Sequence, residues 1–146
     1  MIKKMSMFAV LGIILFSCNS VQNKTTTTNS AKELNGTWEL NYISGPRIAF
    51  EGLYPNKKPT ITFDTKENRV SGNNSCNSFT GKLNVDGHKI SFKDGLASTR
   101  MMCMDNQGEQ VFMDTMLKIT SYDVTDNGKT LNFISGDIAM MRFTKK

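Results

Sequence analysis

Apolar and polar residues alternate along most of the chain after residue 33, and this alternation predicts short β-strands. In the first such segment, Trp38, Leu40 and Tyr42 fall on one face, with polar residues between them. Comparable alternation recurs further along the chain, at 60–63, 79–85, 90–93, 122–124, 131–133 and 139–143. The pattern indicates a domain built mainly of half-buried strands.

Turn signals separate these strands. Asp86-Gly87 and Asn127-Gly128 follow alternating segments and predict tight hairpins, because such turns need residues that tolerate positive φ. Ser135-Gly136-Asp137 is a looser signal of the same kind. Short strands joined by hairpins form an antiparallel meander, and about eight of them stay as one strongly curved sheet or close into a small barrel. The predicted fold class is mostly β, of the α+β type.

One segment, at about 107–119, follows helical spacing instead. Its apolar residues are Phe112, Met113, Met116, Leu117 and Ile119. Asp105 or Asn106 is placed to cap the start of this helix. We expect a single amphipathic helix that covers a face of the sheet or plugs the mouth of a barrel.

The N-terminal segment differs from the rest of the chain. A basic start precedes an apolar stretch over residues 5–16, which is too short to span about 30 Å of hydrocarbon and predicts a secretory signal over residues 1–17. The stretch ends at Leu15-Phe16-Ser17-Cys18, which resembles the bacterial lipobox, although Phe16 replaces the usual small residue. That resemblance implies that Cys18 carries a diacylglycerol. An ordinary secretory signal with a chance cysteine is the alternative.

Residues 18–33 carry this cysteine and a polar tract rich in Asn, Ser, Thr and Lys, which predicts a flexible tether. Two or three acyl chains form a stable anchor, so we expect the mature protein to be attached to a membrane without spanning it. Asn19 stands where many inner-membrane lipoproteins of enteric bacteria have aspartate. We therefore expect a lipid-anchored protein of the cell envelope, in the outer membrane rather than the inner one.

Size and charge narrow the function classes. The chain has 146 residues, which suits one folded domain. Its formal net charge of +5 falls to +3 once the signal is removed with Lys3 and Lys4. Basic residues occur singly or in pairs, so no nucleic-acid partner is expected. A mean hydropathy of −0.34 argues against a polytopic membrane protein.

Two cysteines remain beyond the anchor, Cys76 and Cys103. Outside the cytoplasm such a pair can form a structural disulfide, which would constrain the unfolded chain. Two buried free thiols are the alternative. A catalytic redox pair is disfavoured, because redox motifs keep both sulfurs within one turn of chain.

Three motifs resemble those of a known family. Gly72, Cys76-Asn77, Phe79 and Gly81 match a G-x-x-x-C-N-x-[FY]-x-G pattern. Residues 34–38, which include Gly36 and Trp38, match an L-x-G-T-W opening. Residues 97–103, with Thr99 and Cys103, match an A-x-T-[RK]-M-x-C segment. Together they identify residues 34–146 as resembling the META domain of HslJ-like bacterial lipoproteins.

The chain departs from this pattern at Ser75, where glycine is common, and at Met104, where proline is common. The resemblance implies a small antiparallel barrel or strongly curved sheet with one helix, export to the envelope, and an association with heat or envelope stress. It implies no established activity. The residues themselves give Asn77 a structural role, in which its carboxamide satisfies backbone groups where the strand bends. A ligand-binding carboxamide is the alternative.

The sequence offers little for catalysis, and we expect neither an enzyme nor a cofactor. His88 is the one histidine and lies beside a turn, so a Ser-His-Asp triad has no second candidate base and no zinc cluster can be assembled. Methionines at 101, 102 and 104, and at 140 and 141, could in principle ligate Cu(I). Core filling is the preferred interpretation, and no metal site is predicted.

Three function hypotheses from different classes follow. The leading one is a non-catalytic, stress-linked interaction or envelope-maintenance module that acts as a monomer on an unknown envelope protein. The second is a lipocalin-like carrier of a small apolar ligand, which requires a closed cavity of at least about 300 Å³. The third is an exported inhibitor of a foreign enzyme. Its candidate partner loop, residues 46–59, contains Arg47, Phe50, Tyr54, Lys57 and Lys58.

Overall fold

The computed structural model describes residues 30–104 and 107–146. The signal, Cys18, the tether up to residue 29 and the capping pair 105–106 lie outside the described residues. The strands are β1 (Gly36–Ile43), β2 (Thr60–Asp64), β3 (Arg69–Asn73), β4 (Ser78–Lys82), β5 (Asn84–Asp86), β6 (Lys89–Ser91), β7 (Ala97–Ser98), β8 (Ser121–Thr125), β9 (Thr130–Ser135) and β10 (Ile138–Lys145). The helices are α1 (Ser30–Leu34), α2 (Phe50–Leu53), α3 (Gln107–Met116) and the 3₁₀ turn η1 (Asp126–Gly128).

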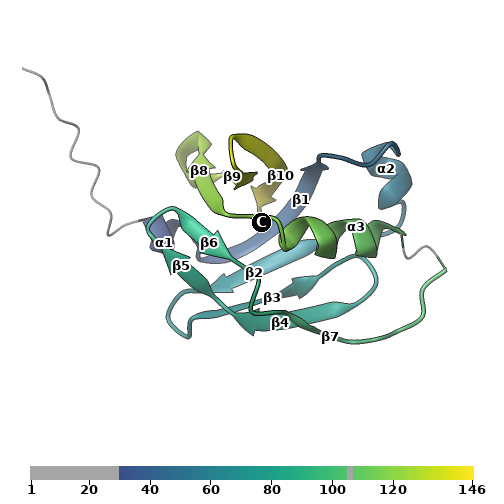
Figure 1. Ribbon diagram of the computed structural model, residues 1–146, viewed down its shortest axis with the longest axis horizontal. Coiled ribbons are helices and arrows are strands. Elements are labelled where there is room, and N and C mark those ends of the chain that lie inside the picture. Colours follow the sequence, from purple (N-terminus) through teal and green to yellow (C-terminus); the bar gives the residue numbers. More distant parts are fainter. Residues whose placement is uncertain (1–29, 105–106) are drawn as a thin grey trace, which may run out of the picture.

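All ten strands form one antiparallel sheet in the order β5-β6-β8-β9-β10-β1-β2-β3-β4-β7. The sheet curls into a half-barrel, with α3 lying across its open side (Figure 1). β5 lies at one edge and β4 next to the other, yet Leu83 alone separates them in the chain. The edge strands β5 and β7 have three and two residues, which leaves little unpaired backbone for another chain to join. The prediction of a mostly-β, strongly curved sheet is confirmed.

The sheet has three more strands than the seven alternating segments of the sequence, for two reasons. β3 and β7 fall in polar segments without alternation, because only Val70 of β3 points into the core. The predicted strand over 79–85 divides at Leu83, whose amide bonds Asn68 O instead of a neighbouring strand. The chain thereby leaves one edge of the sheet and begins the other.

A β-bulge changes the face predicted for Tyr42. The pairing of β1 with β10 shifts register between Leu40 and Tyr42, so Ile43 takes the inward position. Tyr42 is 42% exposed, with Arg142 over its ring. Alternation alone could not show this shift, because an extra residue in the strand reverses the faces that follow it.

Aromatic rings fill the inside of the curl. Phe133 lies at their centre, with ring centroids 5.1 Å from Phe143, 5.5 Å from Phe92 and 6.3 Å from Phe63. Trp38 is fully buried and donates from Nε1 to Leu34 O at 2.7 Å. The space that a lipocalin-like ligand would need is therefore occupied by side chains of the protein itself.

The helices correct two boundaries. Residues 30–33, predicted as tether, form most of α1, because Leu34 at its end is buried and its carbonyl bonds the Trp38 indole. The predicted helix at about 107–119 ends at Met116. Leu117, assigned to the apolar face, is 46% exposed, whereas Ile119 reaches the core from the following loop. Among the described residues, no helix is long and apolar enough to cross a bilayer.

The three predicted hairpins are present. Gly87 has φ 58° in the two-residue loop that joins β5 and β6, and the pair Ser135 and Ile138 closes the loop that contains Gly136. Asn127 has φ 54° in the loop between β8 and β9. The first turn lies one residue further along the chain than predicted, with Gly87 and His88 between the paired residues Asp86 and Lys89.

Candidate functional site

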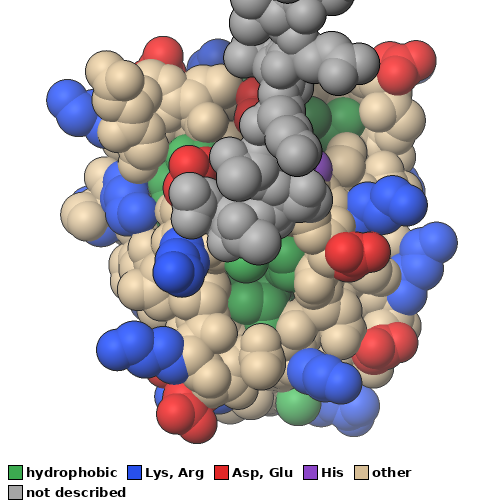
Figure 2. All heavy atoms as spheres, turned by 90° about the vertical axis from the view of Figure 1, so that its left-hand side faces the viewer, with side chains coloured by type: hydrophobic (Ala, Val, Ile, Leu, Met, Phe, Trp, Pro, Cys, Tyr) green, Lys and Arg blue, Asp and Glu red, His purple; other side chains and the backbone are tan. Residues whose placement is uncertain are grey.

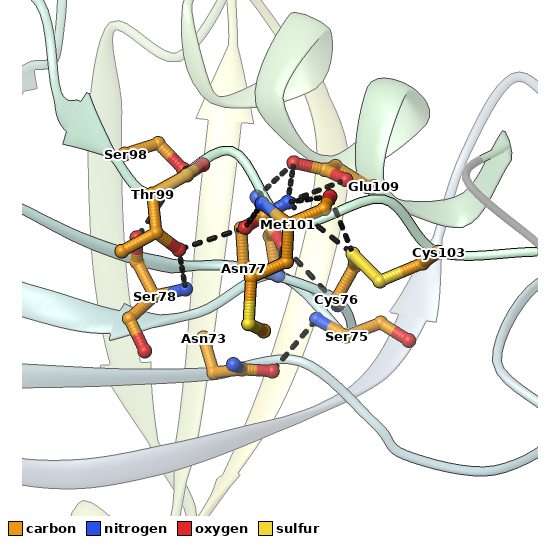
Figure 3. Close-up of a disulfide and its surroundings, with 11 residues drawn as sticks. Asn73, Ser75, Cys76, Asn77, Ser78, Ser98, Thr99, Met101, Cys103 and Glu109 are labelled. Atoms are coloured by element: carbon orange, nitrogen blue, oxygen red, sulfur yellow. Dashed lines mark hydrogen bonds between the residues drawn. A yellow bond between two sulfur atoms is a disulfide. The ribbon is translucent and has the colours of Figure 1, made fainter.

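A polar cluster centred on Asn77 joins three parts of the chain. Asn77 lies between β3 and β4 and is buried. Around it are the segment that runs from β7 to Cys103 and the first turn of α3, which supplies Glu109 (Figure 3). These segments are distant in sequence, so side chains rather than local turns bring them together.

The carbonyl end of the Asn77 carboxamide holds the segment after β7. Its Oδ1 accepts a hydrogen bond from Thr99 Oγ1 at 2.7 Å and another from the Met101 amide at 2.7 Å. Thr99 Oγ1 in turn accepts from the Ser78 amide at 3.2 Å. One buried carboxamide therefore replaces the backbone partner that a strand would have given Met101.

The amide end of Asn77 faces the helix. Its Nδ2 lies 3.0 and 3.1 Å from the two carboxylate oxygens of Glu109, and 3.2 Å from Met101 O. The buried Asn74 donates from Nδ2 to Glu109 Oε1 at 3.1 Å. The Oδ1 of Asn74 accepts a hydrogen bond from the backbone N–H of Asn77 at 2.7 Å. Bonds to an ionised acceptor are the stronger kind. Glu109 therefore ties α3 to the turn between β3 and β4.

A disulfide reinforces the same connection. Cys76 and Cys103 are bonded, with their Cα atoms 6.1 Å apart, as a disulfide requires. The structural disulfide is thus the alternative that the structure supports. It links residues 27 positions apart and ties the Cys103 end of the segment after β7 to Cys76, the neighbour of Asn77.

The segment held in this way exposes methionine side chains. Met101 is 62% exposed, and Met102 and Met104 are fully exposed. A pocket of about 380 Å³ beside them is lined in part by Arg100, Gln110 and Glu109. Large apolar side chains normally lie inside a domain, so exposed ones on a restrained loop are informative. We name residues 99–104 the methionine loop.

Three glycines of the motifs lie where the backbone conformation or the packing favours glycine. A Cβ at Gly72 would collide with Thr60 O and with the ring of Phe79, which lies across Gly72 in the paired strand. A Cβ at Gly81 would meet the side chain of Leu96. Gly36 begins β1 with φ 108°.

The candidate partner loop at 46–59 is only partly exposed. Tyr54 is buried, packs against α3 and donates to Gly108 O at 3.0 Å. Phe50 begins α2 and is half-buried against the core, with Lys58 over its ring. Arg47, Lys57 and Lys58 are exposed. Tyr54 therefore belongs to the core and not to a partner surface, because a buried phenol that bonds a backbone carbonyl has nothing left to offer a partner.

Sequence reasoning assigned Asn77 a structural role but missed its partners. Neither Asn74 nor Glu109 was singled out as a partner of the carboxamide. One feature of the sequence points to the contact between Glu109 and Asn77. Glu109 lies in the first turn of the predicted helix, shortly after Cys103, and a disulfide from Cys103 to Cys76 would bring this turn close to Asn77. His88 is exposed, with Nδ1 3.3 Å from Tyr122 O. No group of three His, Cys, Asp or Glu side chains within 30–104 and 107–146 is placed to hold a metal.

Comparison with known proteins decides the family. The family model of the META domain matches residues 29–146. The chain belongs to the META domain family. The match begins at residue 29, next to the first residue of α1 (Ser30), which lies inside the segment predicted as tether. A search of curated proteins finds no significant match.

Solved structures share the fold of this META domain. An NMR structure of a protein from Burkholderia xenovorans has 19% identity and a TM-score of 0.64, and covers 99% of each chain. Another NMR structure has 24% identity and a TM-score of 0.55, over 77% of this chain and 90% of that one. A crystal structure of a DUF4847 family protein from Bacteroides vulgatus has 13% identity and a TM-score of 0.51, over 77% and 94%. At these identities the likeness shows the fold alone.

Proposed function

We propose that this META domain is a non-catalytic binding module, lipid-anchored at Cys18 in the bacterial cell envelope and linked to envelope stress or maintenance. The methionine loop is its contact surface. The sequence of residues 1–18 supports the anchor, and the outer membrane is the preferred location. The hydrogen bonds among Asn74, Asn77 and Glu109 support a structural rather than catalytic cluster, because the polar atoms satisfy one another.

The exposure of the methionines is the observation that carries this proposal. Methionine is flexible and polarisable, so it adapts to varied apolar partners and recurs on binding surfaces. Here three methionines lie on one loop whose backbone is fixed by Asn77 and by the disulfide. A fixed backbone reduces the ordering entropy lost on binding, whereas the flexible side chains allow fit. An envelope protein with an apolar groove is the partner class that suits this surface.

Site-specific crosslinking tests the contact surface. A photoreactive amino acid in place of Met102 should give, in intact cells, one adduct of defined mass. The same amino acid in place of the exposed Lys57, beside α2, serves as the matched control and should give none. Serine at Met101 and Met104 should abolish the adduct at position 102. Equal adducts at both positions, or no adduct at position 102, would contradict the proposal.

The anchor is tested separately. Cys18→Ala should prevent incorporation of labelled fatty acid and leave the unprocessed precursor with its signal uncut. Cys103→Ala is the control, because it removes another cysteine and should leave labelling intact. A wild-type chain that takes up no fatty acid would contradict the proposed anchor, and it would leave the proposed contact surface unaffected.

A further inference from the structure

A groove outside the polar cluster has an apolar floor. It has a volume of about 610 Å³ and is open to solvent. Leu83, Ile90 and Ile119 contribute buried side chains to its lining, and Val85 is half-buried. The groove falls in the size range of small-molecule sites, which combine apolar walls with a few polar groups. The methionine loop does not contribute to this groove.

The rim of the groove is positively charged. Lys82, Lys89 and Lys93 line it and are exposed, and Asp86 is the one acidic residue among the lining side chains. Within the described residues, the one ion pair joins Lys146 and Glu39, so no carboxylate lies within ion-pair distance of these three ammonium groups. Three lysine ammonium groups and one carboxylate above an apolar floor leave the rim with an excess of positive charge, which suits a ligand with an anionic head and a hydrocarbon body.

The groove lies at the end of the domain where the chain comes from the anchor. In Figure 1, α1, β5 and β6 occupy the same end, and α2 lies at the other. A second hollow at this end is lined by Ala31, Lys32 and Lys66, and Lys66 and Asn68 of the two hollows share the loop between β2 and β3. Figure 2 shows hydrophobic side chains at the centre of this end, with Lys and Arg side chains around them, interspersed with acidic ones.

The sequence limits how far this end can lie from the bilayer. Residues 19–29 separate Cys18 from α1, and a fully extended chain of that length spans at most about 40 Å. A lipidated Cys18 would therefore keep the groove within reach of the phospholipid headgroups. A membrane surface rich in anionic lipid attracts lysine clusters, and the attraction acts within about a Debye length.

We propose that this groove binds the headgroup of an anionic phospholipid of the membrane that carries the anchor. The lysine ammonium groups contact the phosphate, and the floor around Ile90 receives the first carbons of the acyl chains. This inference rests on the proposed anchoring, which supplies the membrane. It gives the domain a defined orientation, with the methionine loop directed away from the bilayer.

Lipid titration of the full chain in detergent tests the groove without using the anchor. Native mass spectrometry should show one bound phosphatidylglycerol, at an affinity clearly above that for phosphatidylcholine. The variant Lys82→Gln/Lys89→Gln/Lys93→Gln should bind phosphatidylglycerol about one hundred-fold more weakly, since each lysine near an anionic headgroup contributes about fivefold. Raising the salt concentration should weaken wild-type binding.

The matched control removes three charges from the other end of the domain. Arg47→Gln/Lys57→Gln/Lys58→Gln should leave phosphatidylglycerol binding within twofold of wild type. Equal weakening by both triple variants would overturn the proposal in favour of net charge alone, and equal affinity for the two lipids would overturn it as well. Because the assay does not depend on acylation, failure of fatty-acid labelling and failure of lipid binding are separate results.

Discussion

The two ends of the half-barrel are built in different ways. At the end with β5 and β6, short hairpins shape the chain through backbone pairing, and left-handed residues such as Gly87 make the turns. At the other end, the methionine loop has little regular structure, and Asn77 and the disulfide hold it. Backbone pairing is distributed over many residues, whereas the loop depends on a few side chains. Single substitutions should therefore lower the free energy of unfolding strongly at the end with the methionine loop (the loop end) and weakly at the end with β5 and β6 (the hairpin end).

Loss of the disulfide should have the largest effect. Replacing Cys76 and Cys103 with alanine should lower the free energy of unfolding by about 3.5 kcal/mol, because the unfolded chain regains the entropy of a large closed loop. Urea denaturation measures the change. At the hairpin end, Gly87→Ala should lower the free energy of unfolding by about 1 kcal/mol, because Gly87 has a positive φ that alanine adopts less readily. A smaller loss from the cysteine pair than from Gly87 would reverse the comparison.

Removal of the Asn77 side chain should have the second-largest effect on the free energy of unfolding. Asn77→Ala leaves the Met101 amide and the Thr99 hydroxyl without their buried acceptor and takes one donor from Glu109, which keeps the bond from Asn74, so we expect the free energy of unfolding to fall by about 3 kcal/mol. Asn41→Ala is the control, because Asn41 bonds two side chains but is exposed. It should lose less than about 1 kcal/mol. Similar losses in the two variants would mean that the cluster around Asn77 is not a specific restraint.

These two effects also mark where sequence reasoning stops. Alternation predicted the strands that bury aromatic rings, such as β9 around Phe133, since one face is apolar and the other polar. It could not predict β3, where Gly72 makes room for the ring of Phe79 and polar residues fill the remaining positions. Nor could it pair Asn77 with Glu109, because that contact depends on how a helix crosses the sheet.

Tyr54 gives the loop end a dependence on pH. Burial raises the pKa of Tyr54 well above its ordinary value, so the folded state keeps the phenolic proton at a pH where the unfolded chain loses it. The contribution of Tyr54 to the free energy of unfolding is therefore fully present below about pH 10. It falls as the pH rises further, by up to about 1.4 kcal/mol per pH unit. Tyr54→Phe should remove this slope. It should also cost about 1 kcal/mol at neutral pH through the lost bond to Gly108 O.

The check on Tyr54 is the difference between wild type and variant in urea denaturation from pH 8 to 11. The two proteins share every other side chain, so the contribution of the rest of the chain cancels in the difference. Parallel stability curves for the two proteins over this range would show that the phenol of Tyr54 is not protected by folding.

Ser75→Gly should change the free energy of unfolding in the opposite direction. Ser75 has φ 90°, a left-handed conformation that glycine adopts without strain, and glycine is common at this position in the META pattern. We expect a gain of about 1 kcal/mol in the free energy of unfolding. Asn68→Gly is the matched substitution in a turn at the other end, where φ is 48°, and should gain less because asparagine tolerates this region. A loss on Ser75→Gly would show that the serine hydroxyl compensates for the strain.

The restraint of the methionine loop by Asn77 is tested most directly by hydrogen exchange at the amide of Met101. This amide donates to Asn77 Oδ1 at 2.7 Å and should exchange slowly in the wild type. In Asn77→Ala it should exchange at nearly the rate of an unprotected amide, whereas amides in β9 and β10 should stay protected relative to that rate. Unchanged exchange at Met101 in the variant would contradict the account, because the loop would then be held by something other than the carboxamide.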